Sequence, residues 1–278
     1  MLECVVNVSE GRDLTILRTI AAAAGSRLVD LHRDPDHHRS VFTLAGEDDA
    51  VEEAARDLAT AVVRSVDITS HVGAHPRIGA LDVVPFVALV GQPLGDGPLK
   101  RSLEARDRFA DWAGSHLDLP CFCYGPEQSL PEVRRGAWRD IQPNRGPMEP
   151  HPTAGAAAVG ARRVLVAYNL WLAEPDLALA RRTASEIRGP DLRTLGLALG
   201  PEVQVSCNLI APWALGPAEA YDAVAARAIV DHAELVGLVP RSIVDATPEH
   251  RWKQLDLDPS RTIEARLERP PTLAELGL

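Results

Sequence analysis

The residues best suited to acid–base chemistry lie in one stretch, residues 71–86, with the sequence HVGAHPRIGALDVVPF. It places His71, His75 and Arg77 just before an apolar run that predicts a buried strand. An imidazole titrates near neutral pH, so it can both accept and donate a proton. Side chains on a loop that leads into a strand are held by the scaffold and remain open to a ligand. The pattern fits a catalytic loop, and it equally fits a loop whose glycines and proline only form a tight turn.

The same two histidines have the spacing of a helical metal-ligand pair, because His71 and His75 stand four positions apart. Gly73 and Pro76 disfavour a helix here, and the glutamate of an H-E-x-x-H motif is absent. We therefore expect no metal site. The sequence also contains no Walker loop and no G-x-S-x-G elbow, which favours acid–base transfer over phosphate or nucleophilic chemistry.

Two further segments of the first half have a composition typical of binding sites. Arg39 enters a predicted strand, where its guanidinium can form paired hydrogen bonds with a carboxylate. The Pro/Gly-rich segment Gly146–Gly155 excludes a helix or a sheet interior. Gly155 and Gly160 would let a flat ligand approach the backbone closely. A linker between domains, running on through residues 156–162, is the alternative interpretation.

The elements that must position these residues follow the order strand–helix–strand–strand–helix–strand, which is typical of a ferredoxin-like unit. In the first half, hydrophobic periodicity predicts strands at 4–8, 28–31, 41–45 and 80–86 and helices around 14–24 and 51–61. The order recurs with strands at 164–168, 195–199 and 203–209, helices around 177–187 and 218–232, and an apolar run at 235–239. We therefore predict an α+β fold with two ferredoxin-like (βαββαβ) subdomains, residues 1–163 and 164–278. The tail from Pro259 is expected to be irregular.

Composition and charge indicate which partners and which cell compartment to expect for the protein. The 278 residues carry a formal net charge of −10, whereas a nucleic-acid binder normally shows a basic footprint, so no nucleic-acid partner is expected. No apolar run is long enough to span a membrane, and the first residues show no secretory signal pattern. Four scattered cysteines suit a reducing compartment. A cytoplasmic protein without membrane attachment is the simplest interpretation.

Five motifs of the first half stand out in order: ECVVNVSEG at 3–11, RSVFT at 39–43, HPRIGALDV at 75–83, HPTAG at 151–155 and VGAR at 159–162. Looser motifs follow at 168–169, 206–208 and 235–240. In this order and spacing they resemble glutamate formimidoyltransferase (formiminotransferase). The resemblance implies a stand-alone transferase without the family's cyclodeaminase domain. Departures include His38, where the family usually has Asn, and Asn144-Arg145, where it usually has Asp-Phe.

The resemblance implies transfer of a formimino group from N-formimino-L-glutamate to tetrahydrofolate in histidine degradation, with substrates in a cleft between the subdomains. It places the catalytic acid–base on His75 and tetrahydrofolate, as co-substrate, on a loop. Arg39, Arg77 and Arg162 are candidates for binding substrate carboxylates, and a homodimer is implied. The substrate-binding loop comprises Gly146, Pro147, Met148, Glu149, Pro150, His151, Pro152, Thr153, Ala154 and Gly155.

Two alternatives stay open at this level. An enzyme with the same fold and folate use could take a different formimino or formyl donor, because the departures at His38 and Asn144 fall in substrate-facing loops. A catalytically silent folate-binding protein is the second alternative, against which the intact His75 argues.

Overall fold

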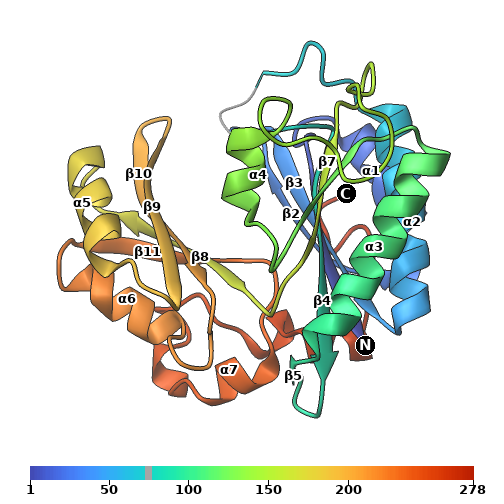
Figure 1. Cartoon of the computed structure of the whole chain (residues 1–278). Coiled ribbons are helices and arrows are strands. Elements are labelled where there is room, and N and C mark those ends of the chain that lie inside the picture. Colours follow the sequence, from blue (N-terminus) through green and yellow to red (C-terminus); the bar gives the residue numbers. More distant parts are fainter. Residues whose placement is uncertain (73–76) are drawn as a thin grey trace. The chain divides into compact units, whose positions relative to one another are not determined.

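The computed structural model of the chain describes residues 1–72 and 77–278. The chain divides into two compact units (Figure 1). The first comprises residues 1–90, 96–163 and 269–278, and the second comprises residues 91–95 and 164–268. Each unit combines one β-sheet with helices, so the α+β class predicted from the sequence is confirmed.

The first unit is built on a mixed sheet in the order β2-β3-β1-β4-β7-β6, with the short strand β5 paired to β4. The β2-β3, β3-β1 and β1-β4 pairs are antiparallel, whereas β7 is parallel to both β4 and β6. Its elements are β1 (Leu2–Val8), α1 (Leu14–Ala24), β2 (Leu28–Asp34), β3 (Arg39–Gly46), α2 (Asp48–Ser65), β4 (Leu81–Val90), β5 (Gly95–Asp96), α3 (Leu99–His116), β6 (Cys121–Tyr124), α4 (Leu130–Gly136) and β7 (Ala157–Ala161).

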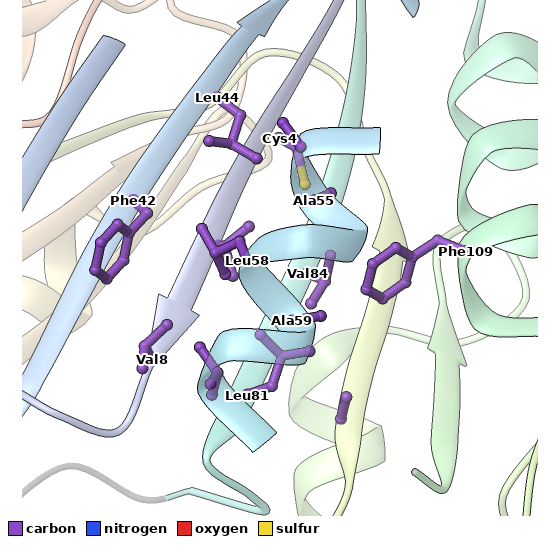
Figure 2. Packing of buried hydrophobic residues seen from close by; sticks show 14 of the residues in the cluster. Cys4, Val8, Phe42, Leu44, Ala55, Leu58, Ala59, Leu81, Val84 and Phe109 are labelled. Atoms are coloured by element: carbon purple, nitrogen blue, oxygen red, sulfur yellow. The ribbon is translucent and has the colours of Figure 1, made fainter. Parts of the chain in front are cut away.

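The core of this unit lies between the sheet and helices α1, α2 and α3. Figure 2 shows α2 presenting Ala55 and Leu58 to the strands that carry Cys4 and Phe42, all four of them buried. Phe109 of α3 extends the same cluster. Burial of this apolar face stabilises both helices, and α2 lies where the amphipathic sequence pattern predicted a helix.

Strand β7 corrects the interpretation of residues 156–162 as a continuation of the Pro/Gly loop. Ala157–Ala161 is a buried strand between two parallel neighbours. Its small side chains have a packing function, since a Cβ at Gly160 would lie 2.0 Å from the Cζ atom of Tyr124. A five-residue run of small residues carries little periodicity, so composition alone favoured a loop.

Helix α4 was not anticipated from the sequence. It begins after Ser129, whose hydroxyl accepts a hydrogen bond from the Glu132 amide while the Glu132 carboxylate accepts one from the Ser129 amide. This capping box stabilises a helix too short to show a clear apolar stripe. Val133 packs with Val83 and Tyr124 in a second, smaller cluster on the sheet face opposite to α1–α3.

The second unit has an antiparallel sheet in the order β11-β8-β10-β9. Helices α5 and α6 pack against one face, where they enclose a core that includes Tyr168, Val205 and Leu235. Its elements are β8 (Val166–Leu172), α5 (Leu177–Ile187), β9 (Leu192–Leu199), β10 (Glu202–Leu209), α6 (Pro217–Ala225), β11 (Val230–Val236), α7 (Arg241–Asp245) and α8 (Ile263–Glu268), with short 3-10 turns at Glu249–Arg251 and Pro259–Arg261.

Two predictions for this half were wrong. The helix expected to reach His232 ends at Ala225, and His232 belongs to β11. The tail from Pro259 is not wholly irregular, because α8 lies within it and contributes buried Ile263. Within the two described ranges, no helix combines the length and hydrophobicity needed to cross a lipid bilayer.

Candidate active site

The predicted acid–base, His75, lies outside the described residues, so the site is built from the residues that flank it. Downstream, the segment entering β4 is held in place by three hydrogen bonds. Asp82 accepts one from the Ile78 amide at 2.8 Å between Oδ1 and N. Ser9 donates its hydroxyl to the Gly79 carbonyl at 2.8 Å and its amide to the Ala80 carbonyl at 2.8 Å. The chain that leaves His75 is therefore fixed to β1 and β4 from its third residue onward.

The Pro/Gly loop is joined directly to this segment. Gly79 and Gly155 form an antiparallel bridge. On either side of it, the Ala80 amide donates to the Ala154 carbonyl at 2.9 Å and the Ala156 amide donates to the Ile78 carbonyl at 3.0 Å. The structure thus brings together the end of the predicted substrate loop and the segment that follows His75.

The loop itself is closed at its far end by His151. The His151 amide donates to the Gly155 carbonyl at 2.8 Å, and the Gly155 amide donates back at 2.9 Å. The ring Nδ1 of His151 accepts hydrogen bonds from the amides of Thr153 and Ala154. An Nδ1 that accepts leaves the proton on Nε2, which fixes the tautomer of a neutral ring.

The first part of the loop is open to solvent. Met148 is 63% exposed, and Glu149, Pro150 and Pro152 are exposed as well. Gly146 adopts a φ of +80°, which favours glycine, and anchors the start of the loop against the carbonyl of Leu119. The loop therefore combines two anchored ends with an accessible middle, as a ligand-binding loop requires.

Arg39 and Arg77 lie at the same end of the sheet as the anchored segment. Arg39 donates to Oδ1 of Asn7, and burial lowers the pKa of its guanidinium to about 10. Arg77 contacts the ring of His71 and donates to the His37 carbonyl at 3.5 Å. Burial also lowers the pKa of Arg77.

Arg162 lies elsewhere on this sheet. Its amide donates to the Phe86 carbonyl at 3.1 Å. Its charge acts on Glu3: burial raises the pKa of the Glu3 carboxyl, and the charge of Arg162 opposes that rise. Glu3 pairs with Val87, four positions along β4 from the Asn7–Val83 pair, which corresponds to roughly 13 Å. The backbone of Arg162 therefore lies at a different point along the sheet from the entry into β4.

A pair of imidazoles adjoins Arg77. The rings of His38 and His71 lie 3.9 Å apart between centroids. Nδ1 of His38 accepts a hydrogen bond from the Gly11 amide at 3.1 Å and lies 3.5 Å from Oε1 of Glu10. Burial lowers the pKa of both histidines, and the charge of Arg77 lowers both further, so each ring is mainly neutral at pH 7.

One residue of this cluster escaped the sequence analysis. Arg134 of α4 donates from Nη2 to Oδ2 of Asp82 at 2.6 Å, in an ion pair whose carboxylate side chain is 2% exposed. Asp82 belongs to the HPRIGALD motif, but nothing in the sequence indicated that Arg134 is a site residue, because α4 itself was not predicted. In the part of the chain that the structure describes, no three His, Cys, Asp or Glu side chains gather as a metal site would require.

These contacts define an α+β protein in which the segment that carries Arg77 and enters β4 is joined to an open Pro/Gly loop. The chain belongs to the formiminotransferase family, as its motifs predicted. The family model for the formiminotransferase domain, N-terminal subdomain, matches residues 1–162.

Three relatives with related names agree with this assignment. Glutamate formimidoyltransferase of Streptococcus pyogenes serotype M1 is 35% identical over 236 residues, which cover 76% of this chain and 77% of that protein. Glutamate formimidoyltransferase of Thermoplasma acidophilum is 28% identical over 97% of this chain and 98% of its own. Formimidoyltransferase-cyclodeaminase of Sus scrofa is 29% identical over 88% of this chain, which corresponds to 51% of that longer protein.

Proposed function

We propose that this protein transfers a formimino group from N-formimino-L-glutamate to tetrahydrofolate, giving 5-formiminotetrahydrofolate and L-glutamate. The family assignment supports the reaction class, because two relatives matched over most of their length are glutamate formimidoyltransferases. The observation that carries the site is the backbone pairing of residues 78–80 with residues 154–156. It joins the segment after His75 to the proposed folate loop, Gly146–Gly155.

The chemistry needs one group that can both accept and donate a proton. N5 of tetrahydrofolate attacks the amidine carbon and loses its proton to His75, which gives a tetrahedral adduct. The bond from that carbon to the glutamate nitrogen then breaks, and the nitrogen takes the proton from His75. An imidazole with a pKa near neutrality performs both steps, at a gain of roughly 10²–10⁴-fold. Holding two substrates in register contributes the rest of the acceleration.

The substrates carry carboxylates, and the arginines are the groups that would bind them. Arg39 and Arg77 lie beside the entry into β4, so we assign them to the formimino donor. Arg162 lies further along the sheet, so we assign it to a different part of the larger co-substrate. A guanidinium fork matches a carboxylate with two parallel hydrogen bonds, which fixes orientation as well as affinity.

The remaining features of the proposal concern fold and assembly. We propose that both units follow the ferredoxin-like arrangement, with a formiminotransferase subdomain at 1–163 that carries the acid–base and a second at 164–278. Tetrahydrofolate is the co-substrate, and the steps above use no metal. A substrate cleft between the subdomains, a homodimer, a cytoplasmic location and the absence of a nucleic-acid partner stay predictions.

A purified-protein assay tests the function. Release of L-glutamate from N-formimino-L-glutamate should require tetrahydrofolate, and calorimetry should detect tetrahydrofolate binding without the donor. Tetrahydrofolate binding without release of L-glutamate from this donor, together with turnover of another formimino or formyl amino acid, would reassign the donor substrate. Binding with no turnover of any donor would show a silent folate-binding protein, and the proposed function would be wrong.

A further inference from the structure

The side chain of Glu3, near the start of β1, is a buried carboxylate without a partner. The residue is 5% exposed. Among the residues that the structure describes, none donates a hydrogen bond to this carboxylate or forms an ion pair with it. Burial raises the pKa of the carboxyl, and the more distant charge of Arg162 opposes that rise. A buried polar group without a partner is costly and therefore requires an explanation.

Glu3 and Arg162 lie on the same face of the sheet. Glu3 pairs with Val87 of β4. The Arg162 amide donates to the Phe86 carbonyl at 3.1 Å, which places Arg162 beside Val87 in the parallel pair of β4 and β7. Residues that pair across a sheet point to the same face, so Glu3 and Arg162 share a face with one strand between them. Two strand spacings separate their backbones by roughly 9–10 Å.

These two opposite charges do not neutralise each other by contact. No ion pair joins them, and in the described part of the chain Arg162 forms none with any other carboxylate. Its Nη1 atom donates only to the neighbouring Arg163 carbonyl, at 2.9 Å. The arrangement therefore favours a ligand that donates hydrogen bonds to the carboxylate and, beside those donors, accepts one from the guanidinium.

We propose that Glu3 and Arg162 recognise the 2-amino-4-oxopyrimidine edge of the pterin ring. This assignment rests on the proposed function, which supplies tetrahydrofolate, and adds Glu3 as a specificity-determining residue. Along that edge the 2-amino group and N3–H are donors, and the adjacent O4 is an acceptor. The carboxylate of Glu3 accepts from both donors in parallel, and the guanidinium of Arg162 donates to O4. Arg162 then binds a carbonyl oxygen of the co-substrate in place of a carboxylate.

The sheet face beyond Glu3 suits a flat ring. Val5 lies between Glu3 and Asn7 on this face of β1, and Val5 and Asn7 are half-buried. On the opposite face, which the helices cover, Cys4 and Val6 are fully buried. Asn7 lies four residues from Glu3, or roughly 13 Å along the strand. A pterin anchored at Glu3 therefore covers Val5 and directs its second ring, which carries N5, toward the entry into β4.

Two small ring compounds test recognition of this edge without any need for turnover. Pterin carries the 2-amino group, whereas lumazine has a carbonyl oxygen at that position, which would face the Glu3 carboxylate. The wild type should bind pterin about tenfold or more tightly than lumazine, measured by fluorescence titration. Glu3→Gln offers one acceptor and one donor in place of two acceptors, so it should bind pterin more weakly and lumazine more tightly. A purely structural role of Glu3 predicts an unchanged preference.

The affinity for tetrahydrofolate, measured by calorimetry, extends the test to the proposed co-substrate. Glu3→Gln and Arg162→Gln should each raise its Kd by about tenfold or more. Glu53→Gln, at an exposed position on α2, and Arg163→Gln, next to Arg162 and exposed, are the matched controls and should keep the wild-type Kd. Thermal unfolding confirms that each variant tested is folded, and the preference of the wild type for pterin requires no variant.

The outcomes distinguish this inference from the proposed function. Tetrahydrofolate binding that depends on Glu3, in a protein that does not turn over N-formimino-L-glutamate, would keep the subsite and remove the proposed reaction. Turnover by Glu3→Gln at the wild-type KM for tetrahydrofolate would keep the reaction and overturn the subsite.

Three further results would overturn the assignment to the pterin. They are equal affinity of the wild type for pterin and lumazine, no binding of either compound, and tighter binding of guanosine, whose purine ring presents the same edge, than of pterin.

Discussion

Gly79 and Gly155 pair as an antiparallel bridge between the segment that follows His75 and the end of the Pro/Gly loop. Neither position has room for a side chain. A Cβ at Gly79 would lie 1.9 Å from the Ala156 carbonyl oxygen, and one at Gly155 would lie 2.6 Å from the Ile78 carbonyl oxygen. The two candidate halves of the active site are therefore one structural unit, and the two glycines are what allows their backbones to approach.

Substitution at this bridge should destabilise the protein and weaken folate binding together. Gly79→Ala must displace the backbone of the loop, so we expect a loss of about 2 kcal/mol or more in the free energy of unfolding, measured in urea. Gly189→Ala is the control, because a Cβ there meets nothing within 4 Å. Equal stability of the two variants would contradict the described packing.

The ion pair between Asp82 and Arg134 should contribute measurably to stability. Removing the carboxylate charge in Asp82→Asn leaves Arg134 without its buried partner, at an expected cost of about 3 kcal/mol in the free energy of unfolding. Asp48→Asn removes a partner of Arg101 in an ion pair whose side chains are 35% and 31% exposed, and should cost about 1 kcal/mol or less. Chemical denaturation of both variants at pH 7 checks the difference.

The imidazole pair predicts a pH dependence of stability. Folding lowers the pKa of both His38 and His71 from the ordinary value of a histidine, about 6.5. As the pH falls from 7 to 5, the unfolded chain therefore binds more protons than the folded chain, and the free energy of unfolding decreases. Asp34 titrates at about pH 2 in the folded chain, because hydrogen bonds from His37 outweigh the effect of its burial. The contribution of the Asp34 carboxylate to stability is therefore lost at a pH below the range of 7 to 5 in which the histidines titrate.

Urea midpoints across that pH range provide the check. His38→Asn removes one of the two groups and keeps a residue type that tolerates the left-handed backbone at this position, where φ is 51°. Its stability should fall less steeply with decreasing pH than that of the wild type. His116→Asn, at an exposed position on α3, should show the wild-type slope. A His38→Asn slope as steep as that of the wild type would remove His38 as the cause.

The sequence predicted most elements of the fold because long amphipathic helices and apolar strands have distinct periods. It failed where elements are short or lack large side chains. Strand β7 consists of small residues, since Gly160 must make room for Tyr124, so its composition resembled that of a loop. Helix α4 is stabilised by its capping box rather than by a long apolar stripe.

The same limits governed the site. The sequence stretch that contains His75 and the Gly146–Gly155 segment stood out because their residue types have a chemical meaning of their own. Arg134 could not be found in this way, because its role depends on a contact with Asp82 that α4 brings about. Only the folded chain could show that the backbone of Arg162 lies further along the sheet than the entry into β4, because strand register decides it.

The rate of formimino transfer from N-formimino-L-glutamate to tetrahydrofolate, compared between the wild type and His75→Ala, tests the central claim most directly. His116→Ala, which removes an exposed imidazole on α3, is the matched control and should keep the wild-type rate. The acid–base role predicts that His75→Ala stays folded, binds tetrahydrofolate and loses about 100-fold or more in kcat. A His75→Ala variant with the kcat of the wild type would contradict it.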